Sequence, residues 1–136
     1  MNEEDAVLAV NAAYYRAFAG ADVAAIERLW AFDGVTCVHP GWRPLVGRQD
    51  VVGSFRDILS GAPAVPIVCR EPQVVITGDF ARVVCLEMVG PVLLAATNCF
   101  VRTGQGWLMN HHQASQVAAA EPAEPSRREK APRILN

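Results

Sequence analysis

The chain of 136 residues is 51% hydrophobic and 19% charged, with a formal net charge of −2. This length fits one domain that can bury a core without disulfides or metal. The weak charge gives no reason to expect a nucleic acid or a membrane surface as partner, and no apolar run approaches the roughly 20 residues of a membrane helix. The acidic start MNEEDAVLAV is unlike a secretory signal, so we expect a cytoplasmic protein.

Helical periodicity marks three segments of the first 61 residues. Apolar residues recur at helical spacing from Ala6 to Phe18, which predicts a helix with an acidic first turn and an end at Gly20. A short second helix follows, with Asp22 as its cap. The segment GVTCVHPGW predicts a short buried strand, broken by Pro40-Gly41. The segment GRQDVVGSFRDILSG, residues 47–61, predicts the third helix.

After Pro66 the pattern changes to alternating, β-branched residues. Four successive strands are predicted at residues 67–77, 80–89, 92–102 and 107–117, and their short links favour antiparallel hairpins. The fold class is therefore α+β, with three N-terminal helices packed on one face of a curved antiparallel sheet. We expect the domain to span residues 1–117. Residues 118–136, rich in Ala, Pro and charge, are expected to form a disordered or extended tail.

Turn positions predict which side chains share a face of the sheet. Tight turns at 78–79, 90–91 and 104–105 would pair Arg70 with Glu87, Val83 with Asn98, and Phe100 with Met109, followed by Asn98 with His111. His111 would then face the helices and His112 the opposite side, unless a bulge or a one-residue slip exchanges them. Both faces are mostly apolar. We therefore expect the outer face to be covered by a second copy of the chain in a homodimer.

The cysteines at positions 37, 69, 85 and 99 lie one per segment in apolar surroundings, without a CxxC pair. This spacing is typical of buried free thiols, and it predicts neither a disulfide framework nor a metal site.

The motifs TCVHPGWRPLVGRQDVVGSF, ATNCFVRTGQGW and NHHQAS, in this layout, resemble the SnoaL-like branch of the nuclear transport factor 2-like (NTF2-like) superfamily over roughly residues 3–117. The resemblance implies a cone-shaped fold in which the sheet wraps the first helix, leaves an open pocket and often dimerises through its outer face. Relatives include polyketide cyclases, ketosteroid isomerases, dehydratases and a kinase association domain. Catalytic members commonly use an Asp or His inside the cone, but no Asp falls in the strands predicted here, so fold does not fix function.

Four polar residues are the candidates for chemistry. His111 could act as a general acid/base near neutral pH, or it could be a hydrogen-bonded inner histidine. Glu87 could be an acid/base group or ligand anchor, or it could form a cross-strand ion pair with Arg70. Asn98 could orient a ligand or bond to its neighbours. His39 could line the mouth of the pocket or cap a turn.

Aromatic and other side chains complete the expected pocket, although ordinary core packing explains them equally well. The expected lining residues are Tyr14, Trp30, His39, Trp42, Phe55, Asn98, Phe100, Met109 and Gln113. We expect a domain that binds a small hydrophobic molecule without cofactor or metal. One alternative is a cofactor-independent isomerase, cyclase or hydratase acting on a hydrophobic carbonyl compound, with His111 as acid/base. The other is a dimerisation module with a vestigial pocket.

Overall fold

The computed structural model describes residues 2–61 and 66–118, and most of the predicted tail lies outside them. Three helices, α1 (Glu3–Ala19), α2 (Val23–Leu29) and α3 (Arg48–Leu59), precede most of the sheet. The strands are β1 (Thr36–Val38), β2 (Leu45–Val46), β3 (Ile67–Thr77), β4 (Phe80–Val89), β5 (Val92–Thr103) and β6 (Gly106–Gln116). The predicted α+β class and its strands are thus confirmed.

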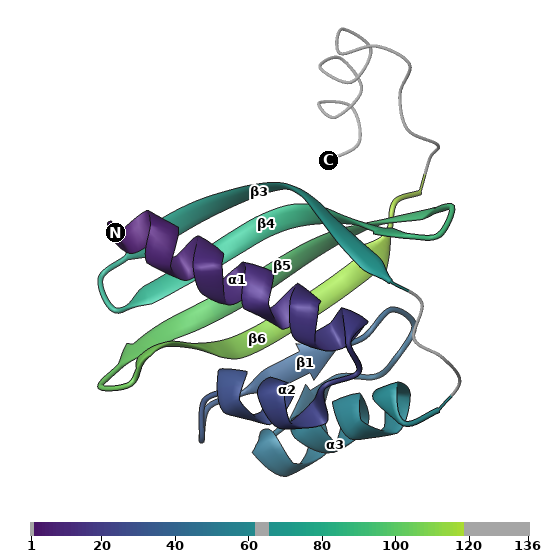
Figure 1. Cartoon of the computed structure of the whole chain (residues 1–136), viewed down its shortest axis with the longest axis horizontal. Helices are drawn as coiled ribbons and strands as arrows, with labels where there is room; N and C mark the ends of the chain where they lie inside the picture. Colours follow the sequence, from purple (N-terminus) through teal and green to yellow (C-terminus); the bar gives the residue numbers. More distant parts are fainter. Residues whose placement is uncertain (1, 62–65, 119–136) are drawn as a thin grey trace, which may run out of the picture.

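The six strands form one curved sheet in the order β2-β1-β6-β5-β4-β3, with α1 lying across its inner face (Figure 1). Strands β3 to β6 form the predicted antiparallel meander. Strand β1 differs from the all-antiparallel expectation because it pairs parallel to β6. Its arrival from the helical part of the chain, and not from a hairpin, allows this direction.

Local signals set the helix ends and the tight turns. The Asn2 side chain accepts a hydrogen bond of 2.7 Å from the Asp5 N–H, and Asp22 caps α2 in the same way at 3.0 Å. Gly78 has φ +62° in the turn between β3 and β4, a left-handed conformation that glycine adopts without strain. These observations agree with the boundaries predicted at Asp22 and at residues 78–79.

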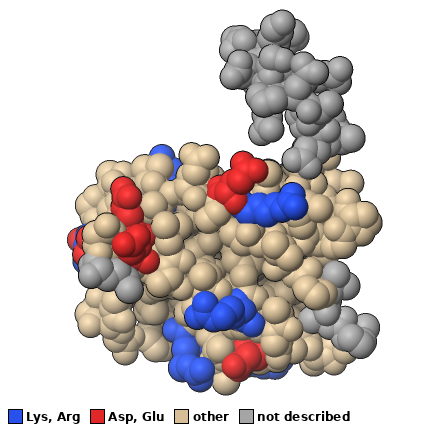
Figure 2. All heavy atoms as spheres, turned by 45° about the horizontal axis from the view of Figure 1, so that its top comes forward, with Lys and Arg blue, Asp and Glu red and all other residues tan. Residues whose placement is uncertain are grey.

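The core lies between α1 and the inner face of the sheet. Its fully buried large side chains include Trp30, Tyr14, Phe55, Phe100 and Met109. The surface in the view of Figure 2 is mostly uncharged, with Arg, Asp and Glu side chains few and scattered. Among the described residues no helix is long and apolar enough to cross a membrane.

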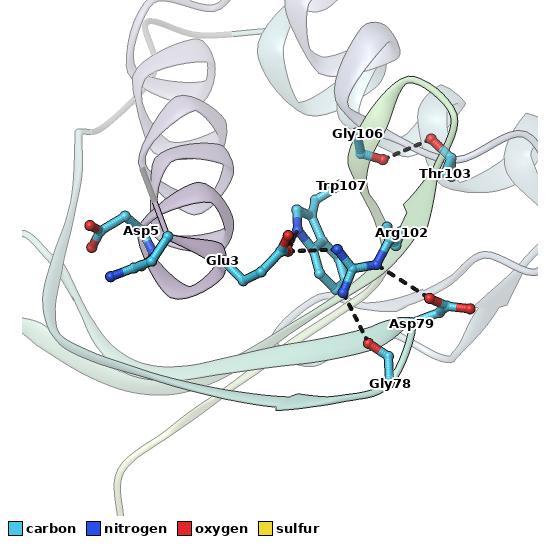
Figure 3. Close-up of polar contacts among 9 residues, drawn as sticks. Glu3, Asp5, Gly78, Asp79, Arg102, Thr103, Gly106 and Trp107 are labelled. Atoms are coloured by element: carbon cyan, nitrogen blue, oxygen red, sulfur yellow. Dashed lines mark hydrogen bonds and ion pairs between the residues drawn. The ribbon is translucent and has the colours of Figure 1, made fainter.

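A cluster of charged side chains connects the start of α1 to the β3–β4 turn and to the β5–β6 hairpin. Arg102 lies 2.7 Å from Glu3 Oε1 and 3.2 Å from Asp79 Oδ1, and it donates to the Gly78 carbonyl (Figure 3). Its guanidinium also stacks 4.5 Å from the centre of the Trp107 ring, whose Nε1–H donates to Glu3. Arg102 and Trp107 are directly paired between β5 and β6.

Candidate functional site

A β-bulge in β6 decides which histidine faces the interior. Phe100 pairs with Met109 as predicted, but Cys99 then pairs with His111 and Asn98 with His112, which leaves Asn110 as an extra residue. A bulge of this kind places two successive residues on one side of the sheet. The predicted inward orientation of His111 is therefore wrong, and His112 takes the inner position.

The orientation of Gln113 changes for the same reason. Gln113 pairs with Thr97 and is exposed on the outer face, whereas Ala114 is buried beneath the helices. The predicted place of Gln113 in the pocket is thus also wrong.

His112 is 3% exposed and belongs to a buried chain of hydrogen bonds. Asn98 uses both of its amide hydrogens, donating to Asn11 Oδ1 at 2.8 Å and to the Tyr15 hydroxyl at 3.0 Å. Asn98 Oδ1 must therefore accept from His112 Nδ1–H, which lies 2.6 Å away. This bond fixes the imidazole tautomer that carries a lone pair on Nε2, for which the described residues supply no partner.

The series of hydrogen bonds ends at the buried carboxyl group of Glu87. The Tyr15 hydroxyl donates to Glu87 Oε2 at 2.6 Å, and Glu87 is 2% exposed. The predicted pairing of Arg70 with Glu87 is wrong, because a bulge between Arg70 and Gln73 moves the register and Cys69 lies opposite Glu87. Glu87 is therefore buried, and no arginine among the described residues forms an ion pair with it.

Burial also shifts the ionisation of these groups. It lowers the pKa of His112 to about 3, with smaller contributions from electrostatic interaction with His39 and His111. It raises the pKa of Glu87, an effect that the hydrogen bond from Tyr15 opposes. Burial and the charge of Glu87 raise the pKa of Tyr15, which keeps this hydroxyl a donor. The imidazole of His112 is accordingly neutral at pH 7.

His39 forms a second polar element on the same side. Ser54 Oγ donates to the Val51 carbonyl at 2.6 Å and therefore accepts from His39 Nε2–H at 2.8 Å. Burial lowers the pKa of His39 to about 4. Its ring packs edge-on against Trp42, with a distance of 4.8 Å between ring centres. Two neutral imidazoles, 6.1 Å apart between ring centres, thus share this region.

His112, Glu87 and His39 line one cavity of about 370 Å³. Its remaining lining is mostly apolar and comes from α1, α3, the loop after β1, and strands β3 to β6: Tyr14, Phe18, Pro40, Trp42, Ile58, Ile67, Val89, Val92, Leu94 and Gln116. A mainly apolar cavity with a few converging polar groups has the character of a small-molecule site.

The structure distributes the predicted pocket residues over three places. Tyr14, His39, Trp42 and Glu87 line the cavity, and Asn98 is buried behind His112. Trp30, Phe55, Phe100 and Met109 belong to the fully buried core and are not among the lining residues.

Sequence reasoning missed Asn11, Tyr15, Ser54 and His112. Asn11 follows Val7 by four residues, and Tyr15 follows Asn11 by four. Helical spacing alone could therefore have placed both on the buried side of α1.

Solved structures with a similar fold indicate the class of protein to which this chain belongs. The fold is similar to that of a proposed dehydratase of the NTF2-like family from Streptomyces avermitilis (31% identity, TM-score 0.79), covering 86% of this chain and 97% of that one. A proposed calcium/calmodulin-dependent protein kinase type II association domain from Thiobacillus denitrificans is 27% identical with a TM-score of 0.70, over 80% of this chain and 93% of that one. A proposed ketosteroid isomerase from Parabacteroides distasonis is 16% identical and shares the fold, with a TM-score of 0.67 over 85% of this chain and 88% of that one.

These likenesses define an α+β protein of the NTF2-like class. The model of the SnoaL-like domain matches residues 7–120, and the chain belongs to that family. No curated protein matches the chain.

Proposed function

We propose that the domain binds a small, neutral, mostly apolar molecule whose polar end carries a hydroxyl group. The observation that carries this proposal is the neutral imidazole of His112, held by Asn98 so that Nε2 is an acceptor at a cavity of about 370 Å³. A ligand hydroxyl would donate to this nitrogen. In the low-dielectric surroundings of the cavity, such a hydrogen bond is stronger than it would be in water.

Glu87 adds the second polar contact of the proposed site. Tyr15 occupies Oε2, so Oε1 is the oxygen left for a ligand. In its neutral form, which burial favours, this group would donate to a ligand carbonyl or hydroxyl oxygen. The raised pKa of Glu87 and the lowered pKa of His112 both disfavour charge, which supports a neutral ligand over an ionic one.

A pair of probes tests the hydroxyl requirement. We expect 2-naphthol to bind about tenfold more tightly than 2-methoxynaphthalene in isothermal titration calorimetry, since one hydrogen bond contributes about 1 kcal/mol. In His112→Leu the two probes should bind alike, while the matched variant His111→Leu should keep the preference. Equal binding of both probes to the unmodified protein, or the same loss in His111→Leu, would refute the proposal.

A cofactor-independent acid/base enzyme is the second candidate. His112 and Glu87 line the same cavity, and the chain is 31% identical to a proposed dehydratase. His112 Nε2 would take a proton from the carbon beside a ketone, and neutral Glu87 would protonate the departing hydroxyl, so that water leaves and a carbon–carbon double bond forms. The bare imidazole, with a pKa of about 3, is a weak base, which is why ligand binding ranks first.

Dehydration of 4-hydroxy-4-phenylbutan-2-one tests this candidate through the absorbance of its conjugated product. If the protein catalyses this dehydration, it should accelerate the reaction. The acceleration should be lost in both His112→Gln and Glu87→Gln. Acceleration that survives in His112→Gln, or no acceleration at all, would eliminate the enzymatic candidate and leave binding.

A homodimer through the outer face of the sheet is part of the same proposal. Support comes from exposed apolar side chains on that face, namely Val68, Val75 and Val84. We expect sedimentation equilibrium to give twice the chain mass, and Val84→Arg to give a monomer. The control Gln105→Arg, in the turn between β5 and β6, should stay dimeric. A monomeric unmodified protein would refute this part.

A further inference from the structure

The outer face of the sheet carries a second group of polar side chains, on the far side of β6 from the cavity. Strand pairing places Arg82 opposite Cys99, Cys99 opposite His111, and His111 opposite Thr36. Directly paired residues lie on the same face of a sheet. A row of four polar or ionisable side chains therefore crosses β4, β5, β6 and β1.

This row borders a hollow of about 340 Å³ that the bulge helps to form. Its lining includes Arg82, Cys99, Asn110 and His111, with the ring of Phe80, 58% exposed, at one side. The bulge brings both Asn110 and His111 to this side of β6. Neither Asp nor Glu occurs among the residues that line it.

Two polar groups of the hollow, Arg82 and Asn110, lack a partner within the described part of the chain. Arg82 makes no ion pair there, and its positive charge acts on the Cys99 thiol, whose pKa it lowers against the larger raising effect of burial. Asn110 Oδ1 is buried without a hydrogen-bond partner among these residues. The hollow thus holds a full positive charge that no carboxylate of the described residues balances, whereas the Asn110 oxygen is an acceptor and takes no part in holding an anion.

His111 is held in a definite orientation at this site. Its Nδ1 lies 2.7 Å from Thr36 Oγ1. When the threonine hydroxyl donates to Nδ1, the ring proton resides on Nε2 and becomes a donor toward a ligand. A bound anion favours this arrangement, because an anion accepts hydrogen bonds from both Nε2–H and the guanidinium.

We infer that this hollow binds a small organic carboxylate, with Arg82 and His111 as its donors and Phe80 against its apolar part. One guanidinium balances a single negative charge, which favours a carboxylate over a phosphate dianion. The inner cavity and this hollow would then select different ligands, a neutral molecule inside and an anion outside.

Sodium benzoate and benzamide, which have the same shape and differ in charge, are the probes. We expect benzoate to shift the amide NMR resonances of Arg82, Asn110 and His111 at a concentration at least about tenfold lower than benzamide requires, since charge-assisted hydrogen bonds are the stronger ones. Arg82→Gln should lower the benzoate affinity about tenfold. Arg82 is exposed, so its replacement leaves the core intact.

Arg70→Gln is the matched control, because Arg70 is an exposed arginine on the same face of the neighbouring strand β3. It should change the benzoate affinity less than twofold, and sedimentation in the same buffer records the oligomeric state of each variant. The inference is overturned if benzoate and benzamide bind alike, if Arg70→Gln weakens benzoate as much as Arg82→Gln, or if the shifts fall on Trp42 and His112 instead. A dimer that buries Arg82 and binds no benzoate also overturns it.

Discussion

His111 and His112 are neighbours in the chain, but they occupy opposite environments. His112 is buried, is neutral at pH 7 and is hydrogen-bonded to Asn98 through Nδ1. His111 is partly exposed beside Thr36 in a hollow that also contains Arg82. The two identical side chains therefore face different sides of the sheet. The register of β6 determines which histidine faces which side.

The difference arises from one extra residue in β6. Without Asn110 as a bulge, strict alternation would place His111 inside and His112 outside. The bulge gives the inner face His112 and Ala114, and it gives the outer face the more polar Asn110, His111 and Gln113. The hydrophobic effect thus favours the bulged register, because it buries alanine in place of glutamine.

The largest expected difference between the two histidines is their effect on the free energy of unfolding at acidic pH. Folding lowers the pKa of His112 to about 3 and that of His39 to about 4, so the unfolded chain binds more protons below its histidine pKa of about 6.5. The free energy of unfolding should fall as the pH drops from about 6.5 toward 3, by up to about 1.4 kcal/mol per pH unit for each histidine.

Urea unfolding at pH 7, 5.5 and 4.5 measures this slope. His112→Phe should make it shallower, whereas His111→Phe keeps both buried histidines and therefore their share of the slope. A slope that flattens in His111→Phe alone would contradict the assignment of His112 to the interior.

Asn98→Ala should be the next largest change. It removes the partner of His112 Nδ1–H and of Asn11 Oδ1 in the interior, and each unsatisfied buried group costs about 1–3 kcal/mol. We expect a loss of about 3 kcal/mol in the free energy of unfolding at pH 7. Thr97→Ala, one residue earlier on the outer side, should cost less than about 1 kcal/mol. Similar losses in the two variants would be inconsistent with the buried network.

Glu87→Gln tests whether the buried carboxyl group of Glu87 ionises at a higher pH than exposed carboxyl groups do. Burial raises the pKa of Glu87, so its contribution to stability is present below the unfolded pKa of about 4.5 and is lost as the pH rises through the folded pKa. Glutamine keeps an oxygen that accepts from Tyr15 and carries no charge. The free energy of unfolding of the variant should therefore rise relative to that of the unmodified protein as the pH increases from 4 to 8, because glutamine does not ionise. A difference that does not vary with pH would contradict this ionisation.

Deletion of Asn110 should have the smallest effect and tests the bulge directly. Removing the extra residue leaves Met109 inside, His111 outside and His112 inside, which is regular alternation. We expect a cost of about 1 kcal/mol, as for a typical single change, with the NMR contact between Asn98 and His112 retained. A contact between Asn98 and His111 in the deletion variant would show that the register depends on Asn110 itself.

The sequence predicted the helices, the strands of the meander and most pairs between them, because each signal is local. Alternation, turn residues at 78–79 and 90–91, and the Asp22 cap act within a few residues of the structure that they determine. The pairs Val83–Asn98 and Phe100–Met109 followed from them.

The bulges of β3 and β6 were not predicted, because each depends on packing against other parts of the chain. A bulge changes the orientation of the residues that follow it, so the one extra residue in β6 reversed the expected orientation of every side chain from His111 onward. One signal was available in β6. Gln113 and Ser115 would have been buried in the unbulged register, whereas only Ala114 of this segment suits an apolar interior.

The chain of hydrogen bonds from His112 through Asn98 and Tyr15 to Glu87 runs in one direction, with every donor pointing toward the carboxyl group. A hydroxyl can pass a proton onward by giving one and taking another, but an amide nitrogen does not exchange its hydrogens in this way. Asn98 therefore does not relay protons between His112 and Tyr15. It transmits polarisation between imidazole and carboxyl, while any proton moving between them must travel through the cavity and whatever occupies it.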